Sequence, residues 1–132
     1  MSFISLGLSG FFQRALDEQG YEAPTAIQAQ AIPAVISGRD LLAAAETGSG
    51  KTAAYVLPLL EILQSQDAPA SNRAAVLVLV PTRELALQVE TSIKSYSRYM
   101  PRRVTSLAVY GGVSINTQMQ ALRGGCDLVI AT

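Results

Sequence analysis

The stretch that decides the fold is Ala45-Glu-Thr-Gly-Ser-Gly-Lys-Thr52, a glycine-rich loop between an apolar run and a helix-forming one. The run 40–45 predicts a strand and the run 50–64 predicts a helix, which is the setting that a phosphate-binding loop requires. Gly48 and Gly50 allow the backbone to curl, so that several N–H groups can converge on phosphate oxygens. The sequence therefore predicts an α/β domain built around a phosphate site.

Two side chains at the end of this loop carry its chemistry. Lys51 supplies a mobile cation that can reach the outer phosphates, and the Thr52 hydroxyl is placed to ligand a Mg²⁺ ion that bridges them. We therefore take Lys51 and Thr52 as the catalytic candidates, with Thr52 as the metal ligand. The remaining candidates for the phosphate cradle are Glu46, Thr47, Gly48, Ser49 and Gly50. The alternative is a glycine-rich turn that carries a solvated lysine.

Apolar runs and helix-periodic segments alternate along the chain. The predicted strands are 40–45, 75–80, 104–110 and 127–131, and three of them lack polar alternation, which is typical of parallel strands buried on both faces. The predicted helices are 9–19, 24–36, 50–64, 84–98 and 113–122. We expect Ser9 to cap the first helix, Pro24 to lie in the first turn of the second, and Pro58 to kink or end the third. This order predicts a doubly wound parallel sheet with helices on both faces.

Composition narrows the classes of function. The chain has 132 residues, enough for one domain, and its ten basic and ten acidic residues cancel, so net charge gives no argument for a nucleic-acid partner. Histidine is absent, and the single cysteine, Cys126, excludes an internal disulfide and is expected to be a small buried filler. We see no signal peptide and no apolar run of the roughly 20 residues that a membrane span needs, so we expect a cytoplasmic protein without membrane association.

With the loop in place, the whole chain resembles the first RecA-like domain of DEAD-box RNA helicases of the bacterial type. Helicases of that family also begin the loop with alanine, as at Ala45, whereas they usually carry glutamine where Glu46 stands. The segment Gly20-Tyr-Glu-Ala-Pro-Thr-Ala-Ile-Gln28 resembles the family's adenine-reading motif, and Phe3 is the aromatic residue that precedes it. The resemblance implies a partial RecA-like domain that binds ATP and Mg²⁺.

The adenine-reading motif implies a role for each of four side chains. The Gln28 amide offers a donor and an acceptor that match the N6 and N7 edge of adenine. Phe3 and Tyr21 would pack against the base, and Thr25 would tie the motif to the phosphate loop. Without this frame, a helical glutamine is usually only solvated. The motif predicts ATP in preference to GTP, with an adenine-reading region at 1–28 and a phosphate-loop sheet core at 39–132.

The segment Pro81-Thr-Arg-Glu-Leu-Ala86 resembles the motif with which the family contacts the RNA backbone. Pro81 opens it, Thr82 and the nearby helix amides could hold a phosphate, and Arg83 provides charge. The plain alternative is a proline stop followed by a helix cap, with Glu84 complementing the helix dipole. Both interpretations can hold at once.

Two further positions extend the candidate RNA path. Gly111 and Gly112 resemble a family position where missing side chains let RNA phosphates approach the backbone, although a double glycine is also an ordinary turn. Thr132 resembles the first residue of the next RNA-contacting motif. A local basic cluster could add to the path or be merely solvated; it consists of Lys94, Arg98, Arg102 and Arg103.

The family's Asp-Glu-Ala-Asp motif is absent from the 132 residues. Its carboxylates hold Mg²⁺ and position the attacking water, so we expect this chain to bind ATP or ADP without efficient hydrolysis or unwinding. The sequence stops directly after a predicted strand, which indicates a sheet truncated before that motif, and an exposed edge predicts low stability or self-association. Two alternatives are another phosphate-loop NTPase and a non-catalytic nucleotide-binding regulatory module.

Overall fold

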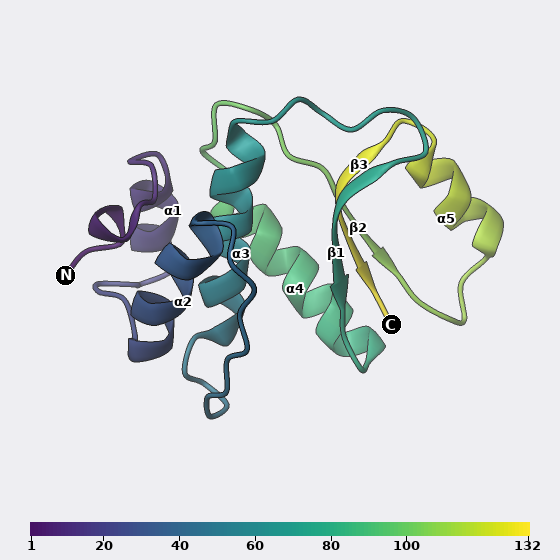
Figure 1. Cartoon of the computed structure of the whole chain (residues 1–132). Helices are drawn as coiled ribbons and strands as arrows, with labels where there is room; N and C mark the ends of the chain where they lie inside the picture. Colours follow the sequence, from purple (N-terminus) through teal and green to yellow (C-terminus); the bar gives the residue numbers. More distant parts are fainter.

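The computed structural model describes all 132 residues as helices packed against a small parallel sheet (Figure 1). The elements in chain order are the 3-10 helix η1 (Ile4–Leu6), α1 (Phe12–Glu18), α2 (Ala26–Ile36), α3 (Lys51–Gln64), β1 (Ala74–Leu79), α4 (Arg83–Tyr96), β2 (Ser106–Val109), α5 (Ile115–Leu122) and β3 (Cys126–Ala131). None of the helices is long and apolar enough to cross a membrane.

The sheet has the strand order β1-β3-β2, and both of its pairings are parallel. The last strand of the chain therefore lies between the two earlier ones. β3 is almost entirely buried, with Leu128 and Ile130 inaccessible to solvent, whereas β1 is an edge strand with alternating exposure. The prediction of strands buried on both faces thus holds for the central strand alone.

The two faces of the sheet are covered unequally. Figure 1 shows α4 on one side of the strands and α5 beyond the other. Val76 and Val78 of β1 pack against the main core, while Leu77 and Leu79, which point to the opposite face, are 61% and 72% exposed. α5 buries only Gln118. The predicted α/β architecture is confirmed, with one face of the sheet closed and the face at β1 open.

The core lies between the helices rather than within the sheet. Leu16 of α1, Ile32 of α2, Leu57 of α3 and Ile93 of α4 are all buried in one apolar cluster that continues to β3. Each comes from a helix with apolar side chains on the face turned toward its neighbours, so burial of these faces holds the bundle together. The N-terminal region is part of this core, because Phe3 is only 2% exposed.

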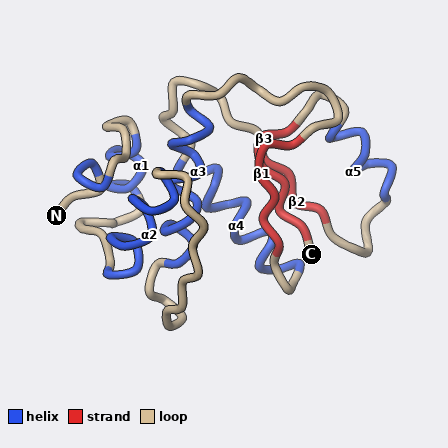
Figure 2. Tube along the Cα trace, in the orientation of Figure 1, coloured by secondary structure: helices blue, strands red, loops and turns tan.

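The run 40–45, predicted as a strand, is instead an extended loop (Figure 2). β1, β2 and β3 pair only with one another, so no strand offers hydrogen-bonding groups to this segment. A strand is defined by such a ladder, and an apolar sequence alone cannot supply it. Leu42 is fully exposed and Leu41 is exposed as well. The prediction of a fourth strand is wrong for the chain as it stands.

Two helix starts also differ from the prediction. Ser9 does not cap α1; its N–H and Oγ donate to the Glu61 carboxylate at 2.8 and 2.7 Å, which fastens the N-terminal region to α3. Pro24 lies outside α2, because Thr25 is the N-cap of that helix. The bounds of α3 agree with the predicted helix 50–64, and of the two outcomes predicted for Pro58, a kink or an early end, the early end does not occur. The neighbours of Pro58 in the helix are buried, and their packing outweighs the lost backbone hydrogen bond.

Candidate functional site

The phosphate loop presents unpaired backbone donors at the start of α3. Gly48 and Gly50 have φ of 82° and 86°, in the left-handed region that glycine adopts most easily, and no side chain caps the helix. The N–H groups of Gly48, Gly50, Lys51 and Thr52 have no acceptor within the protein. Free amides that converge at a helix N-terminus form an anion site, and the helix dipole adds to it.

The polar groups inside the loop keep it in this shape. The Glu46 carbonyl accepts hydrogen bonds from the N–H of Ser49 at 3.3 Å and from its Oγ at 2.6 Å. Lys51 donates from Nζ to the Ala45 carbonyl at 2.5 Å, so its ammonium folds back over the loop. Lys51 is exposed and has no carboxylate partner. A phosphate could therefore attract this cation without breaking an ion pair.

Gln28 is completely buried and joins the adenine-reading motif to the phosphate loop. Its Oε1 accepts from the Thr25 N–H at 2.9 Å, and its Nε2 donates to the Gly50 carbonyl at 3.2 Å. Thr25 in turn accepts at Oγ1 from the Gln28 N–H, which completes a capping box at the start of α2. The hydrogen bond between the motif and the loop comes from Gln28, whereas the side chain of Thr25, for which this link was predicted, bonds only to Gln28.

The two aromatic candidates stack edge to face. The ring centroids of Phe3 and Tyr21 are 6.3 Å apart with an interplanar angle of 68°. Phe3 lies in the apolar core, whereas Tyr21 is half-buried and its hydroxyl is 3.0 Å from that of Tyr96 on α4. Tyr21 is therefore the aromatic side chain of this motif that reaches the solvent-accessible space beside the loop.

A cavity of about 620 Å³ joins these groups. Its walls are the adenine-reading motif, the phosphate loop and the inner side of α4, and its lining residues are Tyr21, Thr25, Thr47, Gly48, Gly50, Lys51, Thr52, Ala53, Leu85, Gln88, Ser92 and Tyr96. A smaller cavity of about 290 Å³ on the other side of the loop contains Ala45 and Ser49 but neither Lys51 nor Thr52. The larger cavity has the volume typical of a small-molecule site.

The predicted RNA-contacting residues meet at the carboxyl ends of the strands. Thr82 is the N-cap of α4 and accepts from the Leu85 N–H at 3.2 Å, so the capping alternative is realised. Arg83 stacks over the Tyr110 ring with its guanidinium carbon 4.7 Å from the centroid. A methyl group at Gly112 would lie 3.9 Å from the same guanidinium. Segments 81–83 and 110–112, far apart in sequence, thus form one surface.

A buried glutamine that the sequence analysis missed shapes this surface. The Gln118 amide accepts from the Tyr110 N–H at 3.1 Å and donates to the carbonyls of Tyr110 and Val113 at 3.3 Å each. These bonds fix the turn that contains Gly111. Thr132 lies at the same place, where its N–H donates to the Val109 carbonyl at 3.2 Å. No sequence signal marks Gln118, because its partners are backbone groups of a turn.

The family model for "DEAD/DEAH box helicase" matches residues 25–132, which is most of the chain. The chain belongs to the DEAD/DEAH box helicase family. It is 46% identical over 131 residues to "ATP-dependent RNA helicase DeaD" of Escherichia coli K12, covering 99% of this chain and 20% of that protein. It is 43% identical to "DEAD-box ATP-dependent RNA helicase 24" of Arabidopsis thaliana, with 99% and 17% covered. The chain therefore spans about a fifth of the length of these relatives.

Solved structures of DEAD-box proteins have the same fold. A DEAD box protein from Methanococcus jannaschii superposes with a TM-score of 0.86 at 34% identity, over 100% of this chain and 34% of that one. A hypothetical ATP-dependent RNA helicase from Sulfolobus tokodaii gives a TM-score of 0.79 at 35% identity, over 95% and 34%. The predicted RecA-like α/β fold and the predicted family are both confirmed.

Within this DEAD-box domain, three of the four residues of the local basic cluster have acidic partners. Lys94 pairs with Glu90 at 2.7 Å, and Arg98 pairs with Glu18 at 3.6 Å. Arg102 turns inward and does not face solvent. Arg103 is exposed and has no ion-pair partner, and Glu18 is shared between Arg98 and Arg14, so part of the positive charge of the cluster stays free.

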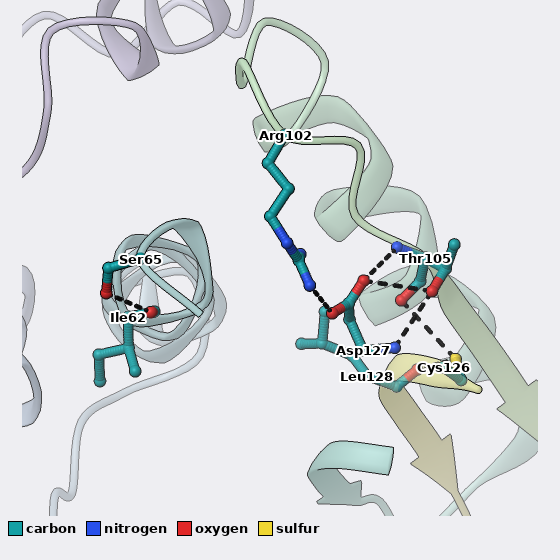
Figure 3. Close-up of polar contacts among 7 residues, drawn as sticks. All are labelled: Ile62, Ser65, Arg102, Thr105, Cys126, Asp127 and Leu128. Atoms are coloured by element: carbon teal, nitrogen blue, oxygen red, sulfur yellow. Dashed lines mark hydrogen bonds and ion pairs between the residues drawn. The ribbon is translucent and has the colours of Figure 1, made fainter. Parts of the chain in front are cut away.

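The inward-facing Arg102 belongs to a buried network at the amino end of β3 (Figure 3). Its Nη2 donates to the Asp127 carboxylate at 2.6 Å, and the other carboxylate oxygen accepts from the N–H and Oγ1 of Thr105 at 2.9 and 3.2 Å. Cys126 lies beside it, only 3% exposed, and burial raises the pKa of its thiol. The predicted buried role of Cys126 is confirmed, and the network locks β3 to the chain that enters β2.

Proposed function

We propose that this chain is the ATP-binding portion of an ATP-dependent RNA helicase that remodels or unwinds RNA in the full-length protein. The observation that carries the proposal is the set of unpaired N–H groups of Gly48, Gly50, Lys51 and Thr52, together with the Lys51 ammonium, on a cavity shared with the adenine-reading motif. Donors and a cation arranged in this way suit the β- and γ-phosphates of a nucleotide.

Residues 1–28 would serve the base and residues 39–132 the phosphates and RNA. Gln28 is already bonded to the Gly50 carbonyl through Nε2, and one Nε2 hydrogen remains for a ligand. Gln28 is fully buried and is not among the residues that line the cavity, so it would reach adenine only after segment 20–28 shifts. Release of its bond to Thr25 would then free Oε1 as an acceptor for the N6 amino group of adenine. Because Gln28 also bonds to the Gly50 carbonyl, a contact between Gln28 and the base would be coupled to the conformation of the phosphate loop.

Magnesium would be bound only together with the nucleotide. The chain holds no group of three histidine, cysteine or acidic side chains that could bind a metal by themselves, and Thr52 offers one hydroxyl. Such a ligand suffices only when phosphate oxygens supply most of the remaining positions. When bound, Mg²⁺ would neutralise phosphate charge. Because no carboxylate lines the cavity to position a water, we expect ATP binding without efficient turnover in this chain.

RNA would contact the surface formed by segments 81–83 and 110–112, with Thr132 at its border. Thr82 and the first amides of α4 would meet a phosphate, and the guanidinium of Arg83 is held at the surface by Tyr110. Gly111 and Gly112 leave the backbone open to a second phosphate. Such contacts are with the backbone and carry little sequence specificity.

The test is a calorimetric titration of the 132-residue chain with ADP and with GDP. We expect saturable ADP binding, weaker GDP binding, and a loss of at least about tenfold in ADP affinity for Lys51→Ala, as removal of a charge-assisted contact would give. Lys94→Ala is the matched control, because Lys94 is exposed, paired with Glu90 and outside the cavity. Equal affinity for ADP and GDP would show that segment 20–28 does not select adenine, and no binding by the folded chain would refute the proposal.

We also propose that the chain self-associates through the β1 side of its sheet. β1 is an edge strand, and the exposed Leu77 and Leu79 lie on its open face. Sedimentation velocity at increasing concentration should reveal dimers or larger species, and Leu79→Lys should return the chain to a monomer. A monomer at all concentrations would exclude this association.

A further inference from the structure

The hydroxyl contact between Tyr21 and Tyr96 joins parts of the chain that are 75 residues apart. The two oxygens are 3.0 Å apart and the ring centroids are 6.2 Å apart at an angle of 46°. Tyr96 lies in the last turn of α4 and is buried, whereas Tyr21 begins the adenine-reading segment and is half-buried. Both side chains line the 620 Å³ cavity opposite the phosphate loop.

The surroundings explain why this pair forms. Desolvation by burial, reinforced by the bond to Tyr21, raises the pKa of Tyr96 far above its usual range, so the hydroxyl stays protonated and can donate. A buried hydroxyl needs a partner, because an unpaired one would lose its hydration without compensation. No other hydrogen bond is made by either hydroxyl within the chain. Each hydroxyl is therefore the other's only protein partner.

Tyr21 has no other polar restraint on its ring. Phe3 packs against the Tyr21 ring with the two centroids 6.3 Å apart, but this contact is apolar and less directional than a hydrogen bond. The bond to Tyr96 fixes the far end of the ring against α4. That helix is itself anchored in the core by Val89 and Ile93, so it is a rigid support.

We propose that Tyr96 is a positioning residue of the nucleotide site, whose hydroxyl holds Tyr21 in place on the adenine side of the cavity. The inference rests on the proposed function, since Tyr21 has this role only if the cavity takes an adenine nucleotide. Tyr96 acts through Tyr21 and requires no contact of its own with the ligand. α4 also carries Thr82 and Arg83 at its other end, so the same helix would support both the base and the RNA surface.

The experiment compares ADP with inorganic tripolyphosphate as ligands of the 132-residue chain. ADP uses both the base side and the phosphate loop, while tripolyphosphate uses the phosphate loop alone. Tyr96→Phe removes the hydroxyl and keeps the ring. We expect it to weaken ADP binding by about threefold to tenfold, the range for one neutral hydrogen bond, and to leave tripolyphosphate binding unchanged.

Two further variants separate positioning from general stability. Tyr21→Phe should weaken ADP binding as much as Tyr96→Phe does, and the double variant should be no weaker than either, because all three lack the same bond. Tyr99→Phe is the matched control: it removes the hydroxyl that donates to Glu18 outside the cavity, and ADP binding should not change.

The possible failures are distinguishable. Unchanged ADP affinity in Tyr96→Phe, or an equal loss for ADP and tripolyphosphate, would overturn the positioning role while leaving the proposed function intact. Additive losses in the double variant would overturn it too, because Tyr21 and Tyr96 would then act separately. If the folded wild-type chain bound tripolyphosphate but not ADP, the proposed function would fail and the positioning role with it.

Discussion

Replacement of Gly50 by alanine tests how the adenine-reading motif is joined to the phosphate loop. Gly50 is the N-cap of α3 with φ of 86°, a conformation that costs an L-residue about 1–2 kcal/mol. A Cβ at this position would collide with the Nε2 of Gln28 and lie 3.3 Å from the Oγ1 of Thr25. Gln28 is fully buried, so its amide has no free space in which to move aside.

The expected cost follows from these two terms. Displacing the Gln28 amide breaks its bond to the Gly50 carbonyl and leaves a buried polar group without a partner, which costs about 1–3 kcal/mol. Together with the backbone term, Gly50→Ala should lower the free energy of unfolding by about 2–5 kcal/mol. Urea unfolding followed by circular dichroism measures this change.

Gly48→Ala is the matched control, because Gly48 has φ of 82° and nothing lies within 4 Å of an added Cβ. It should cost only the backbone term of about 1–2 kcal/mol. The double variant Gly50→Ala with Gln28→Ala should lose less than the sum of its single changes, since the collision is then absent. Equal destabilisation by the two glycine substitutions, with additive behaviour in the double variant, would refute the reasoning.

Two other regions give further predictions. Arg102→Met should lower the free energy of unfolding by about 3–5 kcal/mol, because it leaves the buried Asp127 carboxylate without its cation. The control Arg103→Met changes an exposed neighbour and should alter the free energy of unfolding by no more than about 0.5 kcal/mol in the same urea assay. Similar values for the two variants would contradict a buried ion pair. The raised pKa of Cys126 predicts slower alkylation by iodoacetamide at pH 8.5 in the folded chain than in urea, since less thiolate forms. Because the folded-state pKa is raised, the protonated thiol stabilises the fold fully below the ordinary thiol pKa, and this contribution is lost as the pH rises through the folded-state value; equal alkylation rates would contradict a shielded thiol.

The sequence alone specifies the local motifs of this chain and, through them, its family. The loop 45–52 needs only its own glycines and the helix after it, so its cradle of free amides could be predicted from order along the chain. The segments 20–28 and 81–86 likewise each contain the start of a helix, at the caps Thr25 and Thr82. These features are local, because turns and caps depend on neighbouring residues.

Tertiary structure decided what depends on partners distant in sequence. The run 40–45 has strand-like residues but no strand to pair with, so it stays a loop. Pro58 remains in a helix because the core around it compensates for the lost hydrogen bond. Gln118 and Tyr96 acquire their roles from backbone and side-chain groups that the fold brings to them. Pairing, burial and cavity walls arise from contacts across the chain, and composition and spacing along one segment carry no information about them.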